Sequence, residues 1–224
     1  MLLLVRNVRS EVRSESRSDL ALNVMVSLPE KHPADGQWPV LFFLHGQGEA
    51  APLGLETAAI CHGPLKSGSS KRALDFVVVV PQLPAPGGDV WKDHGAHLQR
   101  IADVVCSEYQ GDRKRKYLCG FSRGGNGVLD FGLTQADDWA ALWAVDPTRS
   151  VPPDRPKRPL FLSLGEYTRG PNWREYIRKN NFADVSSNPD GDRIIIDEGS
   201  NHVEAATRAF AADRVYDWLL KKHL

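Results

Sequence analysis

One serine in this chain lies in a setting that favours nucleophilic chemistry. Residues 120–124 read Gly-Phe-Ser-Arg-Gly, which fits the pattern G-x-S-x-G around Ser122. In that pattern the glycines let the backbone turn sharply from a strand into a helix while the serine hydroxyl stays exposed. The run KYLCGF precedes the turn and a glycine-rich segment follows it, which is the strand-turn-helix order that the chemistry needs. The pattern predicts that Ser122 attacks an acyl carbonyl; the alternative is a structural glycine turn.

A serine hydroxyl needs a general base, and the positions of the histidines indicate one candidate. Of the seven histidines, only His202 and His223 follow Ser122. His223 lies at the end of the last expected helix, which is typical of a solvated side chain. His202 follows the run RIIIDEGSN and precedes that helix, in the loop that would deliver an imidazole to the carboxyl end of the sheet. We therefore expect His202 to be the base, with a residue that merely neighbours a helix cap as the alternative.

The loop LHGQGE, residues 44–49, follows the first buried run and could stabilise negative charge. Such a loop can direct a main-chain N–H towards a developing oxyanion, and the second donor is the N–H of the residue after the nucleophile. By this logic the donors are the N–H groups of Gln47 and Arg123. His45 is expected to organise the loop rather than to catalyse. A tight glycine turn is the alternative for the whole segment.

The elements that must position these residues begin with a series of strands. Residues 20–28 alternate between apolar and polar, which is the period of a half-buried strand. Continuous β-branched or aromatic runs are typical of strands covered on both faces. Such runs occupy residues 40–44, 76–80, 116–121, 141–145, 160–164 and 193–196.

Helices are expected between these strands. Apolar spacing or position in the chain predicts helices at residues 97–109, 124–133, 173–179 and 203–220. Residues 6–19 are expected to be a solvated turn or hairpin loop, and the basic run 113–116 a solvated loop. The order of elements predicts a three-layer α/β/α sandwich around a mainly parallel, twisted sheet, with a single domain over residues 1–224. Because no long insertion separates residues 141–145 from residues 160–164, little or no lid is expected.

Composition excludes several other classes of protein. The 224 residues are 42% hydrophobic and 25% charged, unlike disordered or fibrous chains. Lys plus Arg and Asp plus Glu both number 28, so no overall field recruits nucleic acid or a membrane. The apolar run at residues 1–5 is too short for a signal-peptide core or a bilayer span. The odd count of three cysteines, with Cys106 and Cys119 in apolar settings, predicts reduced thiols and a cytoplasmic location.

Several segments resemble the α/β-hydrolase superfamily. They are LFFLHGQGE, VVVVPQLP, VWKDHGAHL, YLCGFSRGGNGVLDF, EGSNHVEA and YDWLL, and the likeness runs from residue 20 to the C-terminus. They look most like its small carboxylesterase and predicted-peptidase branch, near polyhydroxybutyrate depolymerase-like and dienelactone hydrolase-like esterases. The resemblance implies a Ser, acid, His triad that acts on an ester or a related acyl bond, with no cofactor and no metal.

The acid is where the sequence departs from the family pattern. The family usually has a carboxylate in a pattern like G-x-x-D after the seventh strand, and here GEYT puts Thr168 at that position. A carboxylate is needed to fix the histidine tautomer and to stabilise its cation. Asp146 ends the preceding strand, and Glu166 lies in the expected loop with a longer side chain. We expect Asp146 to be the acid, with Glu166 as the alternative and an impaired or acid-free site as the third possibility.

Four further side chains belong to the same region. Trp91 lies in a loop at the edge where open α/β sheets bind ligands, so it could wall a substrate pocket or simply pack the loop. His94 and His97 could be metal ligands, but no cysteine or carboxylate spacing completes a site. The side chain of Arg123 could meet an anionic group of a substrate or pair with Glu49.

These features predict a serine hydrolase that cleaves a carboxylic ester through an acyl-enzyme, on a small-molecule substrate. The alternatives are a peptidase or acyl transferase with the same site, or a non-catalytic ligand-binding protein on a hydrolase scaffold. Fold does not fix the substrate.

Overall fold

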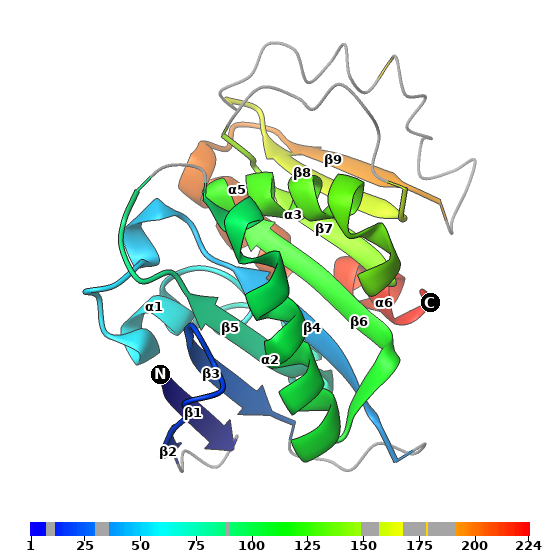
Figure 1. Cartoon of the computed structure of the whole chain (residues 1–224). Coiled ribbons are helices and arrows are strands. Elements are labelled where there is room, and N and C mark those ends of the chain that lie inside the picture. The colour runs from blue at the N-terminus through cyan, green and yellow to red at the C-terminus, as the bar shows by residue number, and fades with distance from the viewer. Residues whose placement is uncertain (8–11, 30–35, 88–89, 149–156, 168–177, 179–190) are drawn as a thin grey trace.

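One mixed sheet organises the part of the chain that the computed structural model describes. That part is the whole sequence except residues 8–11, 30–35, 88–89, 149–156, 168–177 and 179–190 (Figure 1). The nine strands lie in the order β2-β1-β3-β5-β4-β6-β7-β8-β9. Their bounds are β1 Leu2–Asn7, β2 Val12–Ser16, β3 Asn23–Leu28, β4 Trp38–Leu44, β5 Val77–Gln82, β6 Gly111–Phe121, β7 Ala141–Val145, β8 Leu160–Gly165 and β9 Arg193–Asp197.

The six strands from β5 to β9 in this order are parallel, which brings their carboxyl ends to one edge. β4 pairs in parallel with β5 and β6, and parallel pairing continues through β7, β8 and β9. The antiparallel pairs are β1 with β2 and β3 with β5, while β1 and β3 are parallel. All residues of β5, β7 and β8 are buried. For these three strands the prediction of burial on both faces is confirmed. For residues 193–196 it was wrong, because β9 is at the end of the sheet and its isoleucines are partly exposed.

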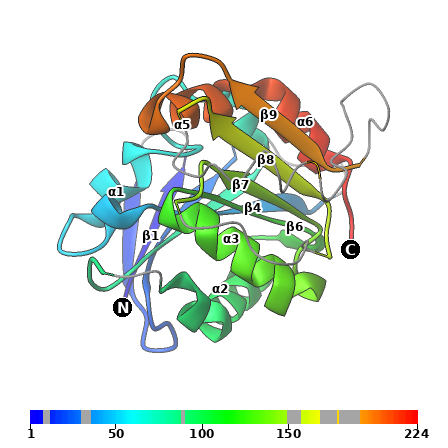
Figure 2. The same cartoon turned by 90° about the horizontal axis from the view of Figure 1, so that it is seen from above.

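Helices cover both faces of the sheet. Figure 2 shows α2 and α3 on one side and α5 and α6 on the other. The α-helices are α1 Leu55–Cys61, α2 Gly95–Glu108, α3 Arg123–Thr134, α5 His202–Ala211 and α6 Asp213–Leu220. Short 3-10 helices are η1 Gln47–Glu49, η2 Lys71–Asp75, η3 Trp91–His94 and η4 Ala136–Asp138.

Two hydrophobic clusters, one for each face, hold these layers together. One cluster contains Leu98 of α2 and Val128 of α3, and the other contains Ala59 of α1, Phe210 of α5 and Leu219 of α6. Burial of such side chains on both faces is the main force that stabilises a sheet between two helical layers. The predicted three-layer α/β/α sandwich with a mainly parallel sheet is confirmed.

Two segments expected to be loops contain strands. β2 lies within residues 6–19, and all five of its residues are exposed, so it has no apolar alternation and is defined only by its backbone pairing with β1. The basic run 113–116 lies inside β6. Arg113 and Lys114 are exposed there, Arg115 is half-buried and Lys116 is buried. Arg113 pairs with Asp103 and Arg115 with Asp112. The expectation of loops was wrong because exposed strands lack the buried pattern that reveals a strand in sequence.

The expected helix at residues 203–220 is two helices. The chain between α5 and α6 is extended at Ala212, with φ −88° and ψ 103°. Asp213, the first residue of α6, accepts a hydrogen bond from the hydroxyl of Ser70, which fixes where the second helix begins. Apolar spacing continues through this break, so the pattern does not mark it. The helix expected at 173–179 falls, apart from Arg178, outside the described residues, as do residues 149–156, on which the expectation of little or no lid depends.

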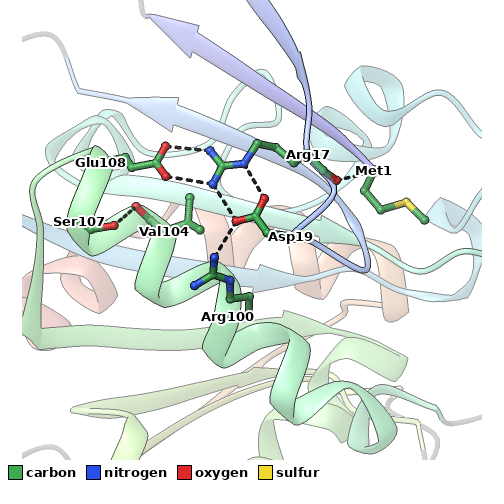
Figure 3. A network of polar contacts seen from close by, with 7 residues as sticks. All are labelled: Met1, Arg17, Asp19, Arg100, Val104, Ser107 and Glu108. Atoms are coloured by element: carbon green, nitrogen blue, oxygen red, sulfur yellow. Dashed lines mark hydrogen bonds and ion pairs between the residues drawn. The ribbon is translucent and has the colours of Figure 1, made fainter.

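A polar network attaches the N-terminal strands to α2 (Figure 3). The guanidinium of Arg17 donates to Asp19 and to both carboxylate oxygens of Glu108, at 2.8–2.9 Å. Arg100 donates to the same aspartate at 2.8 Å. The bonds from Arg17 hold the pKa of the Asp19 and Glu108 carboxyls below their usual range. The network contains no residue of the site described next.

Candidate active site

The serine, aspartate and histidine selected from the sequence meet at the carboxyl edge of the parallel strands. Ser122 follows β6, Asp146 follows β7, and His202 is the first residue of α5, in the connection after β9. The arrow of β6 ends where α3 begins (Figure 1). Parallel strands deliver the residues after them to one edge, so side chains 80 residues apart in sequence, Ser122 and His202, come into contact.

A sharp turn at Ser122 presents its hydroxyl. The residue has φ 59° and ψ −118°, a strained conformation for a residue with a side chain. The turn leaves no room for side chains on the flanking glycines. A Cβ on Gly120 would overlap the carbonyl group of Gly124, and a Cβ on Gly124 would overlap the carbonyl oxygen of Leu44. Both neighbours are backbone atoms and cannot turn aside, so the glycines of G-x-S-x-G are required by sterics.

His202 links the other two side chains. Its Nε2 lies 2.9 Å from Ser122 Oγ, and its Nδ1 lies 2.5 Å from Asp146 Oδ2. Asp146 is 1% exposed, whereas the side chain of His202 is 19% exposed. A neutral imidazole with its proton on Nδ1 donates to the carboxylate and accepts from the serine hydroxyl. This arrangement can withdraw the serine proton.

Local structure fixes both partners of the serine. Asp146 has φ 39°, accepts a hydrogen bond from the Gly165 N–H at 3.2 Å, and donates its own N–H to Ser163 at 2.8 Å. β8 therefore holds the carboxylate. His202 begins α5 behind Asn201, whose side chain caps the helix in a reciprocal capping box with Glu204.

Glu166, the alternative acid, has a different contact. Its Oε2 accepts a hydrogen bond from the Gly199 N–H at 2.6 Å, and the side chain is exposed. It therefore braces the loop that leads to His202, while Asp146 contacts the imidazole. Thr168, the residue at the family's usual acid position, lies outside the described residues.

The loop at residues 44–49 lies against the serine. A Cβ on Gly46 would stand 3.3 Å from Ser122 Cβ, so the backbone there approaches Ser122 closely. His45 is fully buried and organises this loop, because its Nε2 accepts the Leu83 N–H at 3.1 Å and its Nδ1 lies 2.6 Å from the carbonyl of Gly46. Burial lowers the pKa of His45, which keeps the ring neutral.

The expected oxyanion donors belong to two helix starts at this edge. Gln47 opens η1 and Arg123 opens α3. The N–H groups in the first turn of a helix lie at the positive end of its dipole. Because Gly46, which precedes Gln47, approaches Ser122 closely and Arg123 follows Ser122 directly, both helix starts begin next to the serine.

Trp91 packs beneath the loop and does not wall a pocket. It is 1% exposed, its indole N–H donates to the His45 carbonyl at 3.0 Å, and its ring meets the His45 ring edge-on at 5.0 Å. A substrate cannot reach a side chain so deeply buried. Of the two predicted roles for Trp91, the pocket wall is therefore corrected to loop packing.

Sequence reasoning missed two residues that support this loop. Gln82 ends β5 and is 2% exposed, and its amide donates to the carbonyls of Glu49 at 3.1 Å and Leu53 at 2.7 Å. His62 follows α1, and its Nδ1 lies 2.8 Å from the buried carboxylate of Glu49. Burial alone would raise the pKa of Glu49, but the contact with His62 outweighs it and the pKa lies below its ordinary value. Neither residue belongs to a sequence motif.

Among the described residues, two clusters contain side chains of the types that can bind metals. His94 and His97 form a pair with their Nδ1 atoms 3.0 Å apart, and burial followed by the neighbouring histidine lowers the pKa of His94. The group that could hold a metal is Glu49, Cys61 and His62, whose donor atoms all lie within 4.8 Å of one another.

In the described ranges, no helix combines the length and apolarity that crossing a bilayer requires.

The sheet, the turn at Ser122 and the edge where the three side chains meet define the α/β-hydrolase class. Residues 16–215 match the family model described as "Putative esterase". The match covers most of the sequence, and the chain belongs to this esterase family. A comparison with curated proteins finds no match.

Solved structures share this fold. A thermostable esterase has 14% sequence identity and a TM-score of 0.64; the match covers 100% of this chain and 63% of that one, so this chain spans less than two thirds of its length. The fluorophosphonate-binding serine hydrolase F of Staphylococcus aureus has 15% identity and a TM-score of 0.63, with 92% and 96% covered. A feruloyl esterase module from Clostridium thermocellum, complexed with sinapinate, has 13% identity and a TM-score of 0.62, with 98% and 86% covered.

Proposed function

We propose that this protein is a serine esterase that hydrolyses small-molecule carboxylic esters, with Ser122 as nucleophile, His202 as general base and Asp146 as acid. One observation carries the proposal: His202 lies between the other two side chains, 2.9 Å from Ser122 Oγ and 2.5 Å from Asp146 Oδ2. The esterase family and the serine hydrolases that share the fold support it.

Acylation begins at this arrangement. Ser122 Oγ attacks the ester carbonyl carbon while His202 Nε2 takes the hydroxyl proton. The buried carboxylate of Asp146 stabilises the imidazolium that forms and keeps the remaining proton on Nδ1. The carbonyl oxygen becomes an oxyanion, and the N–H groups of Gln47 and Arg123 are the proposed donors to it.

The same residues complete the cycle. The imidazolium returns its proton to the leaving alcohol, which departs and leaves an acyl group on Ser122. His202 then takes a proton from a water molecule, which attacks the acyl carbonyl. The imidazolium returns this proton to Ser122 Oγ as the bond between the acyl group and the serine breaks. No step in this scheme calls for a cofactor.

The wider context is part of the proposal. We assign residues 1–224 to one α/β-hydrolase domain. We assign the protein to the cytoplasm because the described cysteines Cys61, Cys106 and Cys119 are free thiols. Small esters are the expected substrates. The feruloyl esterase module, which was solved with sinapinate, suggests aromatic acyl groups as one set to assay.

Turnover of p-nitrophenyl acetate and butyrate tests the proposal. Wild type should release p-nitrophenol, and Ser122→Ala should reduce the rate by about 10⁶-fold, to the level of the scaffold alone. Equal rates for the two proteins would remove the nucleophile, and with it the proposed mechanism.

A further inference from the structure

Three side chains of different chemistry converge beside the loop at residues 44–49, which we call the oxyanion loop because it contains the proposed donor Gln47. Glu49 ends η1, Cys61 ends α1, and His62 follows Cys61 directly. The donor atoms, a carboxylate oxygen, a thiol sulfur and an imidazole nitrogen, lie within 4.8 Å of one another. The carboxylate is 4% exposed, whereas Cys61 is exposed, so an ion could reach the group from solvent.

The histidine nitrogen in this group faces the carboxylate directly. Its Nδ1 lies 2.8 Å from Glu49 Oε1, which is an ion pair when the ring is protonated, and it has no hydrogen-bond partner outside the group among the described residues. In the neutral ring with its proton on Nε2, the lone pair of Nδ1 and the carboxylate oxygen face each other. A cation bound by both atoms would satisfy them together.

The distances suit a zinc ion after small side-chain movements. Zn²⁺ binds carboxylate oxygen and imidazole nitrogen at about 2.0–2.2 Å and thiolate sulfur at about 2.3 Å, in tetrahedral geometry. Donors in such a site are therefore about 3.3–3.6 Å apart. His62 Nδ1 and Glu49 Oε1 lie 2.8 Å apart and no pair exceeds 4.8 Å, so each separation is within about 1.5 Å of this range. Three protein ligands leave the fourth position to water.

The group is connected to the proposed active site through two routes. Glu49 belongs to the oxyanion loop, and its Oε2 stands 3.1 Å from where a Cβ on Gly46 would be. The ring of His62 stacks on Phe121 at 5.0 Å, and Phe121 contacts the His202 ring at 4.5 Å. Movement of either ligand therefore reaches the nucleophile's surroundings.

We propose that Glu49, Cys61 and His62 form a Zn²⁺ site in the wall of the active site, and that its occupation slows ester hydrolysis. Coordination breaks the Cys61 S–H bond, forms a sulfur–zinc bond and releases the proton to solvent, with no change of oxidation state. The second half of the proposal, slowing, rests on the proposed esterase function; the binding itself does not.

Titration of the metal-free full-length protein with Co²⁺ tests binding, because cobalt(II) commonly substitutes for zinc and a thiolate ligand gives it a charge-transfer band in the near ultraviolet. One equivalent should produce the band, and Zn²⁺ should abolish it by displacement. Cys61→Ser should lose the band and bind Zn²⁺ at least about tenfold more weakly. Cys106→Ser is the matched control, since Cys106 is half-buried elsewhere in the fold, and should keep it. Absence of a band in wild type, or its persistence in Cys61→Ser, would overturn the site.

A second arm tests the coupling. Zn²⁺ should lower p-nitrophenyl butyrate turnover of wild type and of Cys106→Ser, each compared with its own zinc-free rate. The Zn²⁺ concentration that does so should be at least about tenfold lower than the concentration needed for Cys61→Ser. Equal inhibition of wild type and Cys61→Ser would overturn the coupling. Ser122→Ala should still give the cobalt band, so a failure of the esterase proposal leaves the metal measurement interpretable.

Discussion

The substitution Asp146→Asn tests whether Asp146 acts as the proposed acid or only holds the local structure. Oδ1 of Asp146 accepts the Gly165 N–H at 3.2 Å, and Oδ2 lies 2.5 Å from His202 Nδ1. Because the Gly165 N–H needs an acceptor, the amide oxygen of an asparagine takes the Oδ1 position and its NH2 group faces His202. That group donates to Nδ1, so the ring proton moves to Nε2. Nε2 can then no longer accept the proton of Ser122.

The size of the effect follows from this tautomer. A triad with the wrong tautomer, and with an amide in place of the charge that stabilises the imidazolium, loses about 10⁴-fold in kcat, or about 5.5 kcal/mol. The fold should survive, because the amide has the size of the carboxylate and keeps the bond to Gly165. We therefore expect a large loss of turnover with a nearly unchanged unfolding midpoint.

The assay compares kcat for p-nitrophenyl butyrate and urea unfolding midpoints of wild type, Asp146→Asn and Glu166→Gln. The glutamine variant is the control, because Glu166 is exposed and contacts Gly199 rather than the imidazole. It should keep turnover close to that of wild type. The assignment would be refuted if Asp146→Asn kept more than about a tenth of wild-type kcat. It would also be refuted if Glu166→Gln lost as much turnover as Asp146→Asn.

Three further substitutions test the surroundings of the site. Gly124→Ala should lower the free energy of unfolding by about 3 kcal/mol or more, because its Cβ would overlap the Leu44 carbonyl. Gly48→Ala is the control, because nothing lies within 4 Å of its Cβ, and it should lower the free energy of unfolding by less than about 1 kcal/mol. Equal losses in urea unfolding would contradict the steric account of the turn at Ser122. Gln82→Leu removes the amide that donates to the carbonyls of Glu49 and Leu53, and it should cost about 1–3 kcal/mol of unfolding free energy and lower kcat. Unchanged values of both would count against that support. Burial lowers the pKa of His94, so below about pH 6.5 the unfolded chain binds more protons at this residue than the folded protein does. The urea unfolding midpoint of wild type should therefore fall as the pH drops from 7.5 to 5.5, and that of His94→Gln should fall less. An equal fall for the two proteins would contradict this prediction.

The sequence placed the side chains of Ser122 and His202 together because both positions depend on local features. Ser122 lies in a turn whose glycines are required by backbone contacts, and a strand and a helix on either side of it are visible as apolar patterns. His202 follows the last strand, and parallel topology alone brings that connection to the edge where β6 ends. Short-range pattern and sheet order together were enough to place the two side chains near each other.

The carboxylate that contacts His202 could not be chosen from the sequence alone. Asp146 and Glu166 follow neighbouring strands, β7 and β8, and both positions reach the same edge of the sheet. The choice depends on the backbone at Asp146, which has φ 39°, and on which carboxylate the Gly199 loop already uses. Neither a left-handed conformation at an aspartate nor a long-range loop contact has a sequence pattern.

Residues that support the loop were missed for a similar reason. Gln82 reaches the carbonyl of Glu49 across 33 residues, and His62 reaches its carboxylate, through contacts that arise only when the strands have assembled. Trp91 was placed at the correct edge, but its burial depends on close packing against the loop and α3, where a Cβ on Gly127 would stand 2.6 Å from it. Edge position follows from topology, whereas the direction in which a side chain points follows from packing.

Covalent labelling is the most direct test of the central claim that Ser122 is an activated nucleophile. Native protein treated with a fluorophosphonate should gain one adduct by intact mass, located on the peptide that contains Ser122, and Ser122→Ala and heat-denatured wild type should gain none. Folded wild type that stays unlabelled, or label that persists in folded Ser122→Ala, would contradict the account.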